Sequence, residues 1–166
     1  MTARAYIGIG SNLDDPVAQV RAAIDRLAHI PQTRLQQASP LYRNPPMGPA
    51  DQPDYVNAVG AIDTALAPSN LLSELQALEA DAGRQRNGQR WGPRPLDLDI
   101  LLYADLRQAT PTLTIPHPGL PGRAFVLYPL ADIAPGLDVP GHGPLASLLD
   151  GVDAATLALV DEGAHG

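Results

Sequence analysis

The sequence predicts an α+β fold in which two helices cover one face of a mostly antiparallel, four-stranded sheet. Strand and helix patterns follow one another as strand, helix, strand, strand, helix, strand, which is the ferredoxin-like βαββαβ plan. The chain has 166 residues, 45% of them hydrophobic, which is enough for one domain with its own core. Because no repeat or linker divides it, we expect a single domain over residues 1–166, with additional C-terminal elements and a weakly structured tail after about 155.

The N-terminal half contains three of the predicted strands and the first helix. Residues 5–9 form a buried strand that ends at the turn of residues 10–12. Asp14 or Asp15 can cap the helix that follows, and Pro16 suits its first turn. Its apolar stripe consists of Val17, Val20, Ile24 and Leu27. Residues 33–42 are extended, residues 44–53 are a long Pro/Gly-rich loop of the kind that often carries function, and residues 55–62 are the next strand.

The C-terminal half supplies the second helix and the fourth strand. Pro68 suits the first turn of a helix that continues to Gly83, with leucines repeating at helical spacing. A strand runs to about Tyr103, and residues 113–115 are a short extended piece before the turn of residues 116–119. Short helices are expected at residues 124–130 and 145–149.

An aspartate pair and an arginine cluster form the strongest chemical signal. Asp97 and Asp99 are two residues apart in a strand, so both side chains point to one face with Cα atoms roughly 6.6 Å apart, while Leu98 and Ile100 face the core. Four arginines lie within the eleven residues 84–94, namely Arg84, Arg86, Arg90 and Arg94. Guanidinium groups and carboxylate-bound Mg²⁺ both neutralise phosphate, so we expect a site for a metal-bound polyphosphate. The alternatives are helix caps or ion pairs for the aspartates and a solvated loop for the arginines.

Composition excludes several other classes of function. A net charge of -7 argues against a nucleic-acid binder, and no apolar run approaches the roughly 20 residues that span a bilayer. All eleven basic residues are arginine, so the lysine that a Walker A loop requires is absent. Gly8 and Gly10 suggest a dinucleotide-binding fingerprint, but Leu13 occupies the position of its third glycine. The N-terminus has no signal-peptide pattern and the chain no cysteine, so we expect a cytoplasmic protein with no membrane partner.

Three further polar residues are candidates for a site. Asn57 lies in an otherwise apolar strand, where its carboxamide either contacts a ligand or satisfies local backbone groups. Gln76 and Glu79 are i, i+3 neighbours on the second helix, just ahead of the arginine cluster, and a solvated helix face is the alternative for them.

Longer motifs resemble a known family. They are Gly10-Ser11-Asn12-Leu13, Tyr42-Arg43-x-Pro45-Pro46-x-Gly48-Pro49, Asp51-Gln52-Pro53-Asp54-Tyr55-x-Asn57, Arg90-Trp91-Gly92-Pro93-Arg94-x-Leu96-Asp97-Leu98-Asp99-Ile100 and Pro116-His117. In this order, over residues 5 to about 135, the chain resembles 6-hydroxymethyl-7,8-dihydropterin pyrophosphokinases of folate biosynthesis. The family's fold is the ferredoxin-like plan, and its members transfer pyrophosphate from ATP to a pterin alcohol and release AMP. The resemblance therefore implies an ATP-dependent diphosphotransferase, which we expect to be a monomer.

The resemblance also implies a role for individual residues. Asp97 and Asp99 match the ligands of two Mg²⁺ ions, and with Arg84 and Arg94 they form the catalytic set. The ATP-contacting positions are Gln76, Glu79, Arg86, Arg90, Trp91, Arg94, Ile100, Thr114, His117 and Arg123. Arg86, Arg90 and Trp91 lie on a loop that closes over the site. The pterin-contacting positions are Asn44, Pro45, Met47, Tyr55, Asn57, Trp91, Asp97 and Phe125, with the pterin between the rings of Tyr55 and Phe125.

The expected reaction is attack of the pterin hydroxyl on the β-phosphorus of ATP, catalysed by positioning and charge stabilisation because no side-chain base is evident. His117 is either the acid for departing AMP or a phosphate or ribose contact. Pro118, Pro95, Asn87 and Gly88 depart from residues common in the family, which bears on nucleotide affinity. A non-catalytic nucleotide-binding or protein-binding module and a single-stranded RNA binder are the alternative functions, the latter opposed by the acidic charge.

Overall fold

A computed structural model describes residues 2–12, 15–44, 54–84, 96–153, 155 and 157–160, without the side chains of residues 83 and 84. Its main elements are β1 (Ala3–Ser11), α1 (Pro16–Leu27), β2 (Thr33–Ala38), β3 (Tyr42–Asn44), β4 (Tyr55–Thr64), α2 (Pro68–Arg84) and β5 (Asp97–Tyr103). The later elements are β6 (Gln108–Ala109), β7 (Thr114–Ile115), the 3-10 turn η1 (Leu120–Gly122), α3 (Ala124–Ile133), β8 (Asp138–Val139), β9 (Gly143–Pro144), α4 (Leu145–Leu149) and β10 (Ala158–Leu159).

The main sheet is antiparallel and places β1 near its centre. Strand β1 pairs with β4 on one side and with β5 on the other, and β4 pairs in turn with β2 and β3. Strand β10 adds to the free edge of β3. The fold is therefore a mixed α and β arrangement around an antiparallel sheet, as the order of patterns in the sequence predicts.

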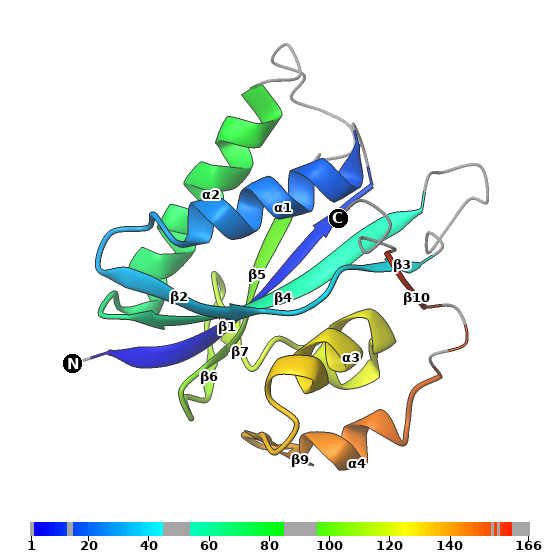
Figure 1. Cartoon of the computed structure of the whole chain (residues 1–166). Helices are drawn as coiled ribbons and strands as arrows, with labels where there is room; N and C mark the ends of the chain where they lie inside the picture. The colour runs from blue at the N-terminus through cyan, green and yellow to red at the C-terminus, as the bar shows by residue number, and fades with distance from the viewer. Residues whose placement is uncertain are drawn as a thin grey trace.

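Helices α1 and α2 cover one face of this sheet (Figure 1). The side chain of Asp15, one of the two caps that the sequence offered, accepts a hydrogen bond from the Ala18 amide at 3.3 Å and caps α1; Asp14 lies outside the described residues. The main core lies between these helices and the sheet, and its fully buried members include Ile7, Val20, Leu27, Leu71 and Leu75. Leu98 and Ile100 belong to this core, which confirms the predicted inward face of β5.

Helices α3 and α4 lie against the opposite face of the sheet (Figure 1). Leu127 and Leu130 of α3 and Leu145 of α4 are fully buried with Tyr6, Val59 and other residues of that face. These helices leave the sheet uncovered where β1 carries glycine instead of a large side chain, and the pocket described below lies there.

The remaining strands are short, and the sequence did not predict most of them. Strands β6 and β7 form a hairpin, and β8 and β9 form another. Two-residue strands are shorter than the windows in which hydrophobic alternation is visible, so they depend on tertiary pairing. Among the described residues, no helix combines the length and the apolar character needed to cross a membrane.

Candidate active site

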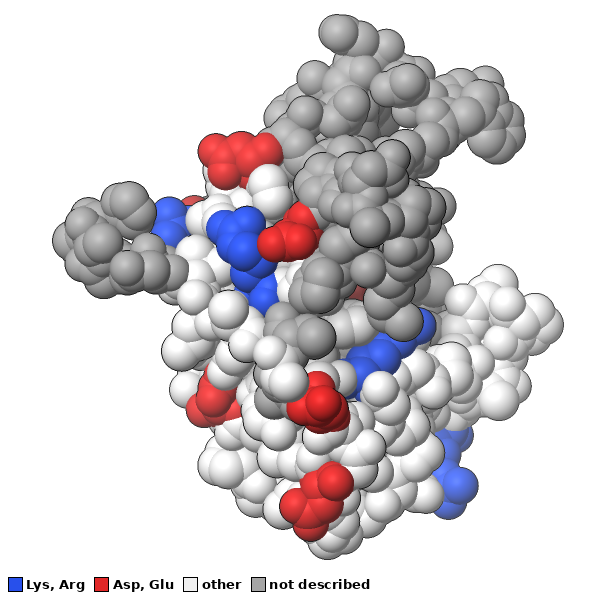
Figure 2. Space-filling model, turned by 90° about the vertical axis from the view of Figure 1, so that its right-hand side faces the viewer, with Lys and Arg blue, Asp and Glu red and all other residues white. Residues whose placement is uncertain are grey.

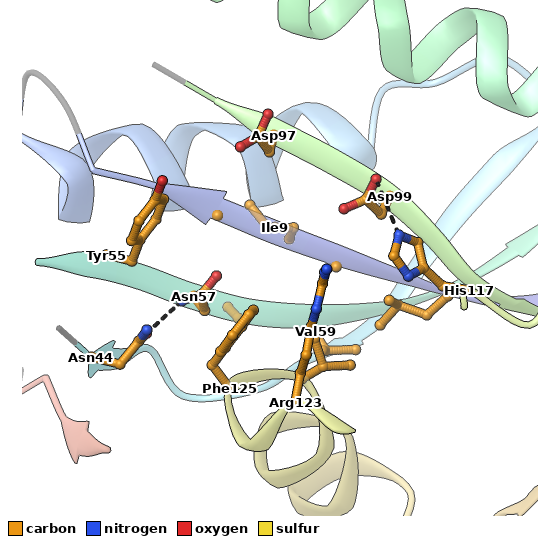
Figure 3. Close-up of a pocket in the computed structure, with 15 residues that line it drawn as sticks. Ile9, Asn44, Tyr55, Asn57, Val59, Asp97, Asp99, His117, Arg123 and Phe125 are labelled. Atoms are coloured by element: carbon orange, nitrogen blue, oxygen red, sulfur yellow. Dashed lines mark hydrogen bonds and ion pairs between the residues drawn. The ribbon is translucent and has the colours of Figure 1, made fainter. Parts of the chain in front are cut away.

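A pocket of about 220 Å³ lies on the sheet between β4, β1 and β5 and is bordered by α3 and by the turn after β7 (Figure 3). It brings together many residues that the sequence singled out, namely Asn44, Tyr55, Asn57, Asp97, Asp99, His117, Arg123 and Phe125. These residues come from five separate segments of the chain. Their convergence makes this pocket the candidate active site.

Two glycines of β1 form the floor of the pocket. Gly10 is paired with Asn57 on one side and Asp97 on the other, and Gly8 with Val59 and Asp99. A Cβ atom at Gly10 would lie 2.7 Å from Oδ1 of Asn57, which is closer than real Cβ atoms approach. In the sequence, these two glycines suggested only an incomplete dinucleotide motif. Glycine inside a strand also marks a place where a ligand or another chain segment approaches closely. The two glycines at alternate positions could therefore have indicated the floor of a pocket.

Asp97 and Asp99 form the carboxylate side of the pocket. Both are exposed, and they alternate with buried Leu98 and Ile100 along β5, as the period of a strand requires. Strand β5 is at the edge of the main sheet. The Leu98 amide between the two aspartates donates to Oε2 of Glu79 on α2 at 2.8 Å. This bond ties the carboxylate-bearing strand to the helix layer, so Glu79 is more than a solvated residue.

The amide of Asn57 is held by a second asparagine. Nδ2 of Asn57 donates to Oδ1 of Asn44 at 2.6 Å, and the two residues are only 8% and 6% exposed. Figure 3 shows the amide oxygen of Asn57 directed away from Asn44, toward the interior of the pocket. The Asn57 side chain therefore satisfies a local partner and also presents an acceptor to the pocket.

Two aromatic rings border the pocket from different elements. Tyr55 comes from β4 and Phe125 from the first turn of α3 (Figure 3). The guanidinium carbon of Arg123 lies 5.8 Å from the centre of the Phe125 ring, within the range of a cation–π contact. Arg123 thus adds positive charge beside the aromatic wall.

His117 links the turn after β7 to the carboxylates. Its Nδ1 accepts a hydrogen bond from the Gly119 amide at 3.0 Å, so the neutral ring carries its proton on Nε2, which lies 3.9 Å from Oδ1 of Asp99. Burial lowers the pKa of His117, the charge of Asp99 opposes this shift, and Arg123 adds to it. The neutral ring therefore presents an N–H toward the carboxylate side.

Some predicted residues lie elsewhere or outside the described residues. Gln76 is exposed on α2, Ile100 is in the helix-side core, and Thr114 lines a second cavity of about 360 Å³ beside the β6–β7 hairpin. Arg84 ends α2, but its side chain is not described. The predicted residues outside the described ranges are Pro45, Met47, Arg86, Arg90, Trp91 and Arg94.

The two carboxylates suit a magnesium ion that shares its ligands with a substrate. Within the described residues, no group of three or more His, Cys, Asp or Glu side chains could hold a metal. Mg²⁺ commonly uses one or two protein carboxylates and completes its shell with water and substrate phosphate oxygens. Asp97 and Asp99, which are exposed on one strand face, fit that mode of binding.

Comparison with known proteins identifies the family. A family model for 7,8-dihydro-6-hydroxymethylpterin-pyrophosphokinase (HPPK) matches residues 6–135. The chain belongs to the HPPK family. A 2-amino-4-hydroxy-6-hydroxymethyldihydropteridine pyrophosphokinase of Pseudomonas aeruginosa is 52% identical to it over 149 residues, which are 90% of this chain and 91% of that protein. The protein of the same name from Haemophilus influenzae is 47% identical over 145 residues, covering 87% and 90% of the two chains.

Solved structures of HPPK proteins share the fold. The crystal structure of wild-type Plasmodium falciparum HPPK-DHPS with pterin and p-hydroxybenzoate matches with a TM-score of 0.68 at 13% identity. A structure of HPPK-DHPS in complex with substrates matches with a TM-score of 0.67 at 12% identity. Each match covers 90% of this chain but only 43% of the larger protein, so this HPPK chain spans less than half of their length.

Proposed function

We propose that this HPPK family member transfers the terminal pyrophosphate of ATP to 6-hydroxymethyl-7,8-dihydropterin, giving AMP and the pterin diphosphate in folate biosynthesis. The observation that carries this proposal is one pocket in which a carboxylate pair, a buried amide and two aromatic rings converge. The family assignment and the names of the 52% and 47% identical relatives support it.

The pterin occupies the side of the pocket formed by β4, β3 and α3. A flat heterocycle gains from packing between the rings of Tyr55 and Phe125, and the Asn57 amide oxygen accepts from the donors on its edge. Asn44 holds the Asn57 amide in that orientation. Pro45, Met47 and Trp91 complete the set expected to contact the pterin, together with Asp97.

The polyphosphate of ATP occupies the other side, next to β5 and the turn after β7. Asp97 and Asp99 would hold two Mg²⁺ ions, which neutralise phosphate charge and polarise the attacking hydroxyl when bound. His117 donates through Nε2–H, and Arg123 supplies fixed positive charge. The other residues proposed to contact ATP are Gln76, Glu79, Arg84, Arg86, Arg90, Trp91, Arg94, Ile100 and Thr114. Because the Ile100 side chain is buried in the helix-side core, its proposed contact is through the backbone, and Thr114 would contact ATP from the neighbouring cavity.

Catalysis rests on orientation and charge. The hydroxymethyl oxygen attacks the β-phosphorus in line, a new O–P bond forms, and the bond between the α,β-bridging oxygen and the β-phosphorus breaks as AMP departs. The buried Asn57–Asn44 pair fixes the pterin plane so that its hydroxymethyl group is directed toward the carboxylate side. Arg84 and Arg94 are proposed to stabilise the transferring group.

Product analysis tests this function. The protein is incubated with Mg-ATP and the reduced pterin, and the nucleotides are then separated. We expect pterin-dependent AMP, and the formation of ADP or the absence of pterin-dependent AMP would contradict the proposal. The Asp97→Ala and Asp99→Ala variants serve as controls, since unchanged activity in either one would exclude metal catalysis at this pair.

The same experiment distinguishes the proposed enzyme from the main alternative, a non-catalytic nucleotide-binding module. Such a module would bind Mg-ATP without forming AMP.

A nucleic-acid-binding function has less support. On the face shown in Figure 2, arginines and acidic side chains of the described residues are interspersed among uncharged ones and form no broad basic surface. The net charge of the chain is -7.

The remaining assignments complete the proposal. The strand order β5-β1-β4, with β4 also pairing with β2 and β3 and with α1 and α2 on one face, supports a ferredoxin-like βαββαβ fold as one domain over residues 1–166. The weakly structured tail predicted after about 155 does not describe residues 158–159, because β10 pairs there with β3. We assign the protein to the cytoplasm, where its co-substrate ATP is available, as a monomer without membrane or nucleic-acid partners. Sedimentation of the purified protein tests the monomeric state.

A further inference from the structure

A hydrogen bond joins two elements that border the pterin side of the pocket. Oη of Tyr42 on β3 donates to Oδ2 of Asp132 on α3, across 90 positions of the chain. Neither residue lines the pocket, yet each belongs to an element that supplies pocket residues.

On the strand side, Tyr42 is close in register to the buried amide pair. Tyr42 is paired with Asn57 across the β3–β4 ladder, and Asn44, two residues along β3, is paired with Tyr55. Asn44 also accepts the hydrogen bond from the Asn57 side chain. A displacement of β3 would therefore move the partner that orients the Asn57 amide.

On the helix side, Asp132 lies on the face of α3 that carries Phe125. The two residues are seven positions apart, close to two helical turns, so their side chains leave the helix in nearly the same direction about 10 Å apart along its axis. Between them, Pro129 has no N–H to donate to the Phe125 carbonyl. The first turn of α3 is thus less firmly tied to the rest of the helix by its own backbone.

The chemistry of the pair favours a well-defined geometry. The acceptor is a carboxylate, which makes the bond charge-assisted and stronger than one between neutral groups. Burial and the Asp132 acceptor raise the pKa of Tyr42, so its hydroxyl remains a proton donor at physiological pH.

We propose that Tyr42 and Asp132 are a positioning pair that sets the separation between the Asn44–Asn57 side and the Phe125 side of the pocket, and thereby the affinity for the pterin ring. The inference rests on the proposed function, because it assigns the occupant of this pocket. It predicts an effect on the pterin with little effect on the nucleotide, whose proposed carboxylate ligands lie on β5.

Binding measurements test this pair. Dissociation constants are measured for the pterin with a non-hydrolysable ATP analogue and Mg²⁺ present, and for the analogue alone. We expect Tyr42→Phe and Asp132→Ala each to raise the pterin Kd by about three- to tenfold, the range for one ordinary hydrogen bond, because this charge-assisted bond is exposed to solvent. The analogue Kd should stay within about twofold of wild type. The double variant should bind the pterin with about the same Kd as the single variants, because both changes remove the same hydrogen bond. Asp132→Asn, which keeps an acceptor oxygen, should restore most of the affinity.

A matched control comes from Arg4 and Asp63. Nε of Arg4 and Oδ1 of Asp63 lie 2.5 Å apart on β1 and β4, six residues, or about 20 Å, along β4 from Asn57. Asp63→Ala removes a cross-element ion pair without touching the pocket, so the pterin Kd should stay at the wild-type value. Urea unfolding of every variant reports stability separately from binding.

Three outcomes would overturn the inference. They are a wild-type pterin Kd in Tyr42→Phe and Asp132→Ala, equal losses of pterin and analogue affinity, and additive effects in the double variant. If the wild-type protein binds the analogue but no pterin, the proposed function itself fails, and the inference fails with it. Wild-type binding with unaffected variants would leave the proposed function intact and reject only the positioning pair.

Discussion

The substitution Gly10→Ala tests the floor of the pocket most directly. The added methyl group would lie 2.7 Å from Oδ1 of Asn57. Asn57 has little freedom to retreat, because its Nδ2 is bonded to Asn44 at 2.6 Å and the residue is only 8% exposed. Either the Asn57–Asn44 bond breaks or strand β1 shifts relative to β4, and both outcomes remove the amide from its present position.

The expected magnitude follows from the interaction lost. Breaking a hydrogen bond between buried amides leaves polar groups without partners at a cost of about 1–3 kcal/mol. If the same amide orients the pterin, a loss of that size corresponds to an increase in the pterin Kd of roughly 5- to 150-fold. The assay is pterin binding in the presence of a non-hydrolysable ATP analogue, combined with urea unfolding.

Gly60→Ala is the matched control, since it places a methyl on β4 facing away from the pocket. That methyl would lie 3.1 Å from Cδ1 of Leu27 in the helix-side core. We expect it to lower stability without changing the pterin Kd. Wild-type pterin binding by Gly10→Ala, or equal weakening of pterin binding in both variants, would contradict this role for Gly10.

Three other predictions follow from single residues. Arg94→Ala should lower the rate of AMP formation by on the order of 10³-fold or more if Arg94 stabilises the transferring phosphate, and a tenfold loss in steady-state kinetics would reduce its role to ground-state binding. Glu79→Ala should lower the free energy of unfolding in urea by about 1.5–3 kcal/mol, because the Leu98 amide loses a charged acceptor. Glu79→Gln keeps an acceptor oxygen, so it should lower the free energy of unfolding by less. Equal decreases in the two variants would contradict this role for Glu79. The pKa of Tyr42 is higher in the folded state than in the unfolded chain, so its contribution to stability is complete below about pH 10 and is lost as pH rises further. The free energy of unfolding in urea should therefore fall more steeply above pH 10 for wild type than for Tyr42→Phe. If it falls equally in both proteins, the hydrogen bond to Asp132 does not raise the pKa of Tyr42.

Much of the site was predictable where its chemistry is local in sequence. Asp97 and Asp99 share a face because alternation is a property of every strand, and Leu98 and Ile100 confirm the register by their burial. The cap at Asp15 and the start of α2 at Pro68 follow from backbone geometry within one turn.

Other features depend on pairing between distant segments. Asn57 had two possible roles in the sequence, and only the register of β3 on β4 brings Asn44 within 2.6 Å of it. The acceptor at the Leu98 amide is Glu79, whose i, i+3 spacing to Gln76 indicated nothing more than a helix face. The two-residue strands β6 to β10 likewise carry no periodic signal of their own.

The sequence by itself determined the order of the main strands and helices, the inward face of β5, the two aspartates on one face and, through its motifs, the family. Only the tertiary structure decided that Gly8 and Gly10 form the floor of the pocket. It also decided that a hydrogen bond between Tyr42 and Asp132 joins β3 to α3. The physical reason is the range of the interactions. Periodicity and capping act within a few residues, whereas the width of a pocket depends on contacts between segments that meet only after the chain has folded.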